Sequence, residues 1–410
     1  MSTSTDLTYN PLDPTFLADP YPTYRRLRDE DPVHRSPFGF WVLSRHRDCF
    51  ALLRDPRCSV DYRNLRHSLE DDPDPTAARS LKDLYTFLFL DPPEHTRIRG
   101  QLAEAFSNDA VHPLEPFIDQ RVRDVNARLT EGESLDLIAE LAYPLPIDVI
   151  CRILGLDDTD WQQVRSWSKA LARGLDPEFT QTEDSLVIGQ HAMHDLLEYF
   201  RDEIARRKRK PTNGLLTDLV AAGQLSGDEI ARNCLLLLVA GHETTANLLG
   251  NGLLALLEPQ HEHLRERVSD NASTELLNRT VEELLRYDSP IQVTKRIPHA
   301  EPIDVGGTTL APGDMVVLLL GSANRDPDAF DNPDQLDIDR TINPHVAFGG
   351  GAHYCIGAKL ARFEVNIALR TLAPTLPRLI IDRTPPVKEG VIVRGRESLC
   401  VRVMESAPVR

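Results

Sequence analysis

We predict a mainly α-helical fold with small β-sheets (α+β), built as one large domain over residues 1–410. Apolar residues recur at helical spacing over residues 21–29, 115–129 and 193–207. Strand-like runs are short, and they lie at residues 40–43, 303–305, 315–320 and 399–403, beside turns at Gly306-Gly307 and Pro312-Gly313. The balance of 41% hydrophobic and 27% charged residues leaves ample material for a core.

The net charge excludes one class of partner. The chain has 46 Lys and Arg against 63 Asp and Glu, a formal charge of -17 at pH 7. Such a charge repels phosphate backbones and anionic lipid surfaces at long range. We therefore expect no nucleic-acid partner.

The start of the chain carries no targeting signal that we recognise. Residues 1–10 are polar, without the basic start and apolar stretch of a signal peptide, and no apolar run approaches the length of a membrane span. We expect a cytoplasmic, monomeric protein without a membrane anchor.

The six cysteines form no close pair of the kind that a structural zinc site needs. We interpret the set as reduced thiols, mostly packed inside. They are Cys49, Cys58, Cys151, Cys234, Cys355 and Cys400.

The longest predicted helix starts at Ser226, which has the spacing of a capping box with Glu229, and ends near Pro259. At roughly 30 residues it would be about 45 Å long. Residues 235–240 are apolar on all sides, so we expect the helix to cross the middle of the molecule. The polar cluster 241–245 interrupts this run. It indicates either a functional site or a kink in which Thr244 bonds back to the carbonyl of Ala240.

The second unusual segment is the loop 345–357, in which three successive glycines precede Cys355 and a helical stretch from 358 to about 372 follows. The glycines allow tight turns and leave little bulk near a flat ligand. Free amides and the following helix dipole would stabilise a thiolate, which suits a metal ligand. A buried structural cysteine is the alternative.

The motif Phe348-x-x-Gly351-x-x-x-Cys355-x-Gly357 resembles the cysteine loop of the cytochrome P-450 superfamily, in its soluble bacterial form. Other segments agree in order and spacing, and the resemblance covers about residues 13–403. They are Ala240-Gly241-x-Glu243-Thr244-Thr245, Glu283-x-x-Arg286, residues 91–99, Ala323-Asn324-Arg325-Asp326-Pro327 and Asp337-x-Asp339-Arg340. The resemblance implies the cytochrome P-450 fold, with the long central helix crossing over the haem.

The resemblance also implies the site. Cys355 would be the metal ligand of haem b, with Phe348 and Gly357 beside the sulfur and the porphyrin. On the other face, Ala240 and Gly241 would leave room for O2 and substrate, and Glu243 and Thr244 would be the catalytic proton relay.

Three further groups of residues follow from the same resemblance. Four would neutralise the haem propionates: His95, Arg99, Arg296 and His353. Three would hold the cysteine loop: Glu283, Arg286 and Arg340. Seven would line a mainly apolar substrate pocket: Phe87, Phe89, Leu237, Ile291, Val293, Thr294 and Ile392.

The function that the resemblance implies is monooxygenation: insertion of one atom of O2 into a hydrophobic small molecule, by hydroxylation or epoxidation, as a biosynthetic tailoring step. No flavin or iron-sulfur module is recognisable, so a separate ferredoxin and its reductase are expected as partners. Lys359, Arg362 and Arg97 are candidates for docking them.

Alternatives remain open at this point. The same fold can perform oxidative coupling, desaturation or peroxide-driven oxidation, and a haem-binding sensor or carrier would share the cofactor. A hydrolase with Cys355 as nucleophile and His353 as base is a further reading. It leaves the long helix, Glu283 and Arg286 unexplained.

Overall fold

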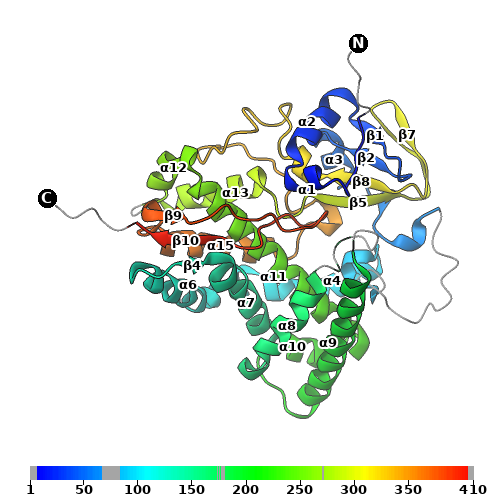
Figure 1. Ribbon diagram of the computed structural model, residues 1–410. Helices are drawn as coiled ribbons and strands as arrows, with labels where there is room; N and C mark the ends of the chain where they lie inside the picture. Colours follow the sequence, from blue (N-terminus) through cyan, green and yellow to red (C-terminus); the bar gives the residue numbers. More distant parts are fainter. Residues whose placement is uncertain are drawn as a thin grey trace.

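A computed structural model of the chain describes residues 7–66, 84–172, 174, 176, 181–269 and 272–404. Figure 1 shows one long helix between two unlike parts, a strand-rich part near the N-terminus and a helical part below it. The helices are α1 (Pro14–Ala18), α2 (Tyr21–Glu30), α3 (His46–Leu52), α4 (Glu94–Leu102), α5 (Asn108–Val111), α6 (Glu115–Thr130), α7 (Pro144–Leu154), α8 (Trp161–Ala172), α9 (Glu183–Arg209), α10 (Leu215–Ala222), α11 (Gly227–Leu257), α12 (Glu262–Arg267), α13 (Thr274–Tyr287), α14 (Leu320–Ala323) and α15 (Ala358–Leu372).

The strands form three small sheets, so the predicted α+β class is confirmed. The largest has the order β1-β2-β8-β5-β3, with β2 and β8 parallel and the other pairs antiparallel. The others have the orders β4-β10-β9 and β6-β7. The strands are β1 (Val33–Arg35), β2 (Trp41–Leu43), β3 (Cys58–Ser59), β4 (Leu135–Asp136), β5 (Val293–Pro298), β6 (Ile303–Val305), β7 (Thr308–Leu310), β8 (Val316–Leu319), β9 (Leu379–Ile381) and β10 (Cys400–Val403).

The long central helix is present as predicted. The Ser226 hydroxyl accepts the Glu229 amide at 3.2 Å, and the Glu229 carboxylate accepts the Ser226 amide at 2.8 Å, which completes the capping box. Helix α11 then runs for 31 residues, about 46 Å, and ends where Glu258 is extended before Pro259. It packs against α7, α9, α13 and α15, so its apolar residues form the centre of the core.

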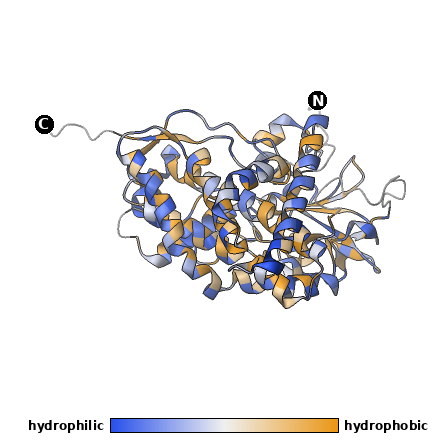
Figure 2. Cartoon of the chain, turned by 90° about the horizontal axis from the view of Figure 1, so that it is seen from below, coloured by the Kyte–Doolittle hydropathy of each residue, from blue (hydrophilic) through white to orange (hydrophobic). Residues whose placement is uncertain are grey.

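The core explains why these segments are helical. In Figure 2 most helices carry both hydrophobic and hydrophilic residues, the pattern of helices that bury one face. One cluster of buried side chains extends from Leu84 to Val401 and includes residues of α4, α6, α7, α11, α13 and α15. Two smaller clusters lie on the faces of the five-stranded sheet. No helix within the described residues is long and apolar enough to cross a membrane.

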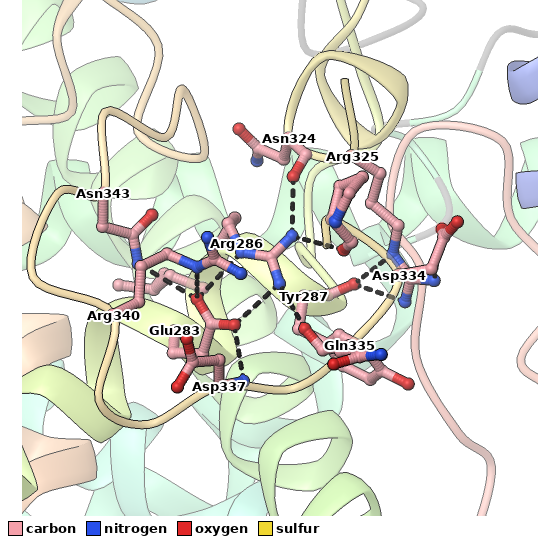
Figure 3. A network of polar contacts seen from close by, with 12 residues as sticks. Glu283, Arg286, Tyr287, Asn324, Arg325, Asp334, Gln335, Asp337, Arg340 and Asn343 are labelled. Carbon is pink, nitrogen blue, oxygen red and sulfur yellow. Dashed lines mark hydrogen bonds and ion pairs between the residues drawn. The ribbon is translucent and has the colours of Figure 1, made fainter. Parts of the chain in front are cut away.

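A buried carboxylate joins α13 to the segment before the cysteine loop (Figure 3). The Glu283 side chain is 1% exposed and accepts two hydrogen bonds from Arg286, at 2.7 and 2.8 Å. It also accepts the Asp337 amide at 2.8 Å, Arg340 Nε at 3.0 Å and Asn343 Nδ2 at 3.2 Å. The expected contact of Arg340 with this pair is therefore present.

Arg286 extends the network to the backbone. Its guanidinium donates to the carbonyls of Asn324, Pro333 and Gln335 at 2.6 to 2.9 Å. The Asn324 side chain in turn accepts the amide of Val346, where the cysteine loop begins, at 2.8 Å. A continuous chain of hydrogen bonds thus connects α13 with the start of that loop.

We predict that Glu283→Ala destabilises the protein by about 3–5 kcal/mol, because it leaves the Arg286 guanidinium buried without its anion. Urea unfolding and the amount of haem per purified chain would measure the effect. Glu275→Ala is the matched control on the same helix, since the Glu275 side chain is 79% exposed. Equal stability of the two variants would contradict a supporting role for Glu283.

Candidate functional site

The cysteine loop closes on itself through backbone hydrogen bonds. The amide of Gly349 donates to Val346 at 2.8 Å, and the amide of Cys355 donates to Phe348 at 3.0 Å. Gly349 and Gly351 have φ values of 69° and 67°, which side-chain-bearing residues rarely adopt. A Cβ at Gly351 would lie 2.6 Å from the carbonyl oxygen of Leu53. These glycines are therefore required by the turn and by packing against the segment after α3.

The sulfur of Cys355 lies at the end of this loop, directly before α15. Burial raises the pKa of the Cys355 thiol, whereas the Gly357 amide and the positive charges of Arg99 and Arg362 lower it. Burial thus opposes the predicted stabilisation of the thiolate, whereas the Gly357 amide acts in the predicted direction. A metal cation at the sulfur would supply the missing stabilisation, since coordinating thiols are deprotonated.

Gly357 differs from Gly351 because the space beside its Cα is empty. Among the described residues, no atom lies within 4 Å of a Cβ built at Gly357, and its φ is an ordinary -87°. Neither the backbone nor neighbouring side chains therefore require a glycine here. Clearance for a flat group beside Cys355 would account for the glycine.

Three residues of the central helix are less buried than the rest. Within the fully described stretch 233–257, every residue is buried except Ala240, Gly241 and Thr244, which are half-buried. Positions i, i+1 and i+4 lie on one side of a helix. The side of α11 formed by Ala240, Gly241 and Thr244 is therefore the one that can face a ligand, as the sequence predicted.

Four basic side chains from three elements converge near the loop. His95 and Arg99 lie on α4, Arg296 lies on β5, and His353 lies in the turn before Cys355. The rings of His95 and His353 are 4.2 Å apart, and Arg99 donates to the Tyr354 carbonyl at 2.6 Å. Burial first, then the charges of His95, Arg296 and Arg99, lowers the pKa of His353 to about 3. The structure thus brings all four predicted residues together.

This basic group fits two carboxylates. Among the residues that the structure describes, neither ring nitrogen of His95 has a hydrogen-bond partner, although both are buried. Unpaired buried donors are costly, and like charges destabilise one another. The two propionates of a haem beside Cys355 would satisfy His95 and offset the positive charge. The residues present therefore fit the cofactor.

Glu243 is held by residues that lie far away in the sequence. Its carboxylate is buried and forms an ion pair with Lys388, and it accepts a hydrogen bond from Asn247 at 3.0 Å. Burial raises the pKa of Glu243, but Lys388, His242 and Asn247 together bring it below its usual value. The carboxylate is therefore ionised. Asn247 could have been expected from its i+4 spacing, whereas nothing in the sequence indicated Lys388.

Thr244 makes the bond that the kink interpretation described. Its hydroxyl donates to the carbonyl of Ala240 at 2.8 Å, although α11 continues without a break. The oxygen still has lone pairs that can accept a proton or a hydrogen bond. The back-bond and a functional role for Thr244 are thus compatible.

Most predicted pocket residues border α11 or the C-terminal segment. Leu237 is buried on α11, and the amide of Phe87 donates to Asn233 of the same helix at 3.1 Å. Ile291 is bridged to Val393, and the Gln292 amide donates to Ile392 at 2.9 Å. These contacts bring the segment 291–294 beside Ile392.

Val293 does not fit the predicted pocket. Successive residues of a strand point to opposite faces, so Val293 faces away from Thr294 and Arg296. It packs instead in the cluster of Tyr9, Phe16 and Leu319. We therefore withdraw Val293 from the pocket.

Known proteins share these features. The family model "Cytochrome P450" matches residues 156–373. The chain belongs to the cytochrome P450 family. It is 37% identical to the monooxygenase PikC of Streptomyces venezuelae over 94% of this chain and 92% of PikC, and 36% identical to the vitamin D(3) 25-hydroxylase of Pseudonocardia autotrophica over 96% and 94%. A structure of P450BioI with an acyl carrier protein ligated to hexadec-9Z-enoic acid matches with a TM-score of 0.86 and 34% identity, over 95% of this chain and 99% of that chain.

Membership excludes two of the alternatives left open by the sequence, the hydrolase and the haem-binding sensor or carrier. The chain is a cytochrome P450 monooxygenase, and P450 proteins use haem iron and O2. Two relatives from Bacillus subtilis, 34% and 32% identical, are named for biotin biosynthesis and for polyketide biosynthesis. The structure does not support the hydrolase: among the described residues, no hydrogen bond joins the Cys355 and His353 side chains, and the His353 ring lies 4.2 Å from that of His95.

We predict that His95→Phe raises the rate of haem release by about tenfold, because one hydrogen bond to a charged propionate is lost. Transfer of haem to an excess of apomyoglobin would measure the rate. His242→Phe is the control, since His242 is also buried but its ring bonds Leu238, Ser168 and Tyr143. This control should lower the urea midpoint and leave haem release unchanged. A His95→Phe variant with the wild-type release rate would contradict the propionate assignment.

Proposed function

We propose that this P450 binds haem b through Cys355 and inserts one atom of O2 into a hydrophobic small molecule, by hydroxylation or epoxidation. The observation that carries the proposal is the placement of a half-buried cysteine after the glycine loop, with four basic residues beside it and one open side on α11. We also infer that residues 1–410 form one haem domain, since the main core cluster joins elements from both halves of the chain. The cytoplasmic, monomeric state stays a prediction.

Cys355 would ligate the iron, with Phe348 packed in the same loop and Gly357 giving clearance. Bound haem would supply the activation of O2, and a thiolate ligand favours cleavage of the O–O bond. His95, Arg99, Arg296 and His353 would hold the propionates. Ala240 and Gly241 would leave room for O2 and the reacting part of the substrate.

Thr244 and Glu243 would deliver protons during oxygen activation. Thr244 is the half-buried alcohol on the open side of α11, and it can release its bond to Ala240 by rotating about χ1. Glu243 is the ionised carboxylate next to it, although its side chain is held by Lys388 and Asn247. Because the carboxylate is ionised, it would first have to take up a proton, and it could pass that proton to Thr244 only after moving or through a connecting water molecule.

Electrons would come from a separate ferredoxin and its reductase. The three candidate docking cations differ in whether they already form an ion pair within the described part of the chain. Arg97 pairs with Glu229, and Arg362 pairs with Glu282 and lies over Phe348. Lys359 is exposed on α15 and makes no ion pair within the described part of the chain. Lys359 is thus the best candidate of the three.

The first test is the spectrum of the reduced protein with carbon monoxide. We expect a strongly red-shifted Soret band, because Cys355 would ligate the iron as a thiolate, and we expect Cys355→Ala to lose this band. Cys400→Ala is the control, a half-buried cysteine on β10. A wild-type band at the position of histidine-ligated haem would contradict Cys355 as the ligand.

The proposed proton relay is tested by measuring coupling, the amount of product formed per reductant consumed. We expect Thr244→Ala to keep its haem and to consume reductant, while the product formed per reductant consumed falls by about tenfold or more. The excess should be recovered as peroxide. Thr245→Ala is the control, since Thr245 makes the same type of back-bond, to Gly241 at 3.1 Å, but is buried. Unchanged coupling in Thr244→Ala would point to a different relay.

A further inference from the structure

Glu282, the neighbour of Glu283 on α13, makes a second set of contacts with the cysteine loop. Its carboxylate accepts two hydrogen bonds from Arg362 of α15, at 2.5 and 2.9 Å. It also lies 3.0 Å from Nε2 of His345, at the start of that loop. Successive helical residues point about 100° apart, so the two glutamates bind separate partners. Glu282 therefore joins the segments that precede and follow Cys355.

Arg362 continues these contacts into the loop. Its guanidinium carbon lies 4.4 Å from the centroid of the Phe348 ring, and Nη1 donates to the Tyr354 hydroxyl at 3.1 Å. The rings of Phe348 and Tyr354 also contact each other, with centroids 6.2 Å apart. A guanidinium that binds a carboxylate along one edge and covers a ring with its face is held in a defined orientation. The position of this charge is thus fixed relative to the loop.

The charge of Arg362 acts on the sulfur. The Phe348 carbonyl accepts the Cys355 amide at 3.0 Å, so the ring under Arg362 belongs to a residue that is bonded to the cysteine itself. Burial raises the pKa of the Cys355 thiol, and Arg362 is one of the groups that lower it. Glu282 carries the opposite charge and offsets part of this effect.

The pair is partly exposed and yet remains ionised. The side chains of Arg362 and Glu282 are 32% and 31% exposed. Solvent therefore screens part of their charge, and a salt bridge of this kind adds little to stability. Burial raises the pKa of Glu282, but hydrogen bonds from His345 and Arg362 bring it down to about 2. Both members of the pair therefore keep their charge at pH 7.

We propose that Glu282 and Arg362 are positioning residues that set the electron affinity of the haem iron through Cys355. The inference rests on the proposed function, in which Cys355 ligates the iron and a ferredoxin supplies one electron at a time. A positive charge near the ligand favours the reduced iron, which carries one more electron, and a negative charge favours the oxidised iron. Arg362 raises the reduction potential of the iron, and Glu282 limits this rise.

The test is a spectroelectrochemical titration of the haem-loaded enzyme without substrate, which measures the reduction potential of the iron. We expect Arg362→Gln to lower the potential and Glu282→Gln to raise it, each by about threefold in the ratio of reduced to oxidised iron, or about 30 mV. The double variant should lie between the two single variants. Arg362→Lys keeps the charge and should stay near the wild type.

Glu275→Gln is the control on the same helix, since the Glu275 side chain is 79% exposed and pairs with Arg279. It removes the same charge and should leave the potential unchanged. A shift as large as that of Glu282→Gln would assign the effect to net charge and overturn the inference.

A purely structural role predicts a different result. Both single variants would then shift the potential in the same direction and the double variant would shift it furthest, which would contradict the proposal. If Arg362→Gln does not retain haem, the sign of the Glu282→Gln shift decides alone. An unchanged potential in Arg362→Gln together with weaker ferredoxin binding would assign Arg362 to docking only and would also overturn the inference. Failure of the proposed function would be seen elsewhere, as a wild-type carbon monoxide spectrum without the thiolate band.

Discussion

The buried carboxylate of Glu283 is the constraint on which the position of the site depends. It accepts five hydrogen bonds, two from Arg286 and one each from Asp337, Arg340 and Asn343. Neither ion can remain in the interior without the other, so the segment that supplies their remaining partners has little freedom. That segment leads into the cysteine loop at Val346. The Glu283–Arg286 ion pair on α13 therefore fixes the position of the loop.

The cysteine loop and the central helix have different physical requirements: the loop must turn tightly, and the helix must be buried. The loop needs glycines, because Gly351 packs against the Leu53 carbonyl and turns in the left-handed region. Helix α11 is buried almost throughout, and its only half-buried residues between 233 and 257 are Ala240, Gly241 and Thr244. One side thus presents a sulfur on a rigid turn, and the other presents small residues and one alcohol. A haem that is ligated on one face and binds O2 and substrate on the other would require two such different sides.

Basic side chains gather beside the cysteine loop. His95, Arg99, Arg296 and His353 come together although they lie in separate parts of the chain. The protein as a whole is strongly acidic, with a net charge of -17. Burying the charged Arg99 and Arg296 in such a chain is costly by itself, and bound anions would offset that cost. The charge distribution therefore identifies the kind of group that belongs there.

The sequence by itself determined the local elements, and the tertiary structure decided which of them meet. The capping box at Ser226 fixed the start of α11, and the glycine loop and the helix from Ala358 to Leu372 were found where predicted, because caps, glycines and apolar spacing act over a few residues. Strand β5 was not predicted, since Lys295 and Arg296 interrupt its apolar pattern, and Val293 was assigned to the wrong face. The pairing of Glu243 with Lys388, 145 residues away, left no local signal at all. Long-range electrostatic partners and the faces of short strands depend on how the whole chain packs, and only the folded structure contains that information.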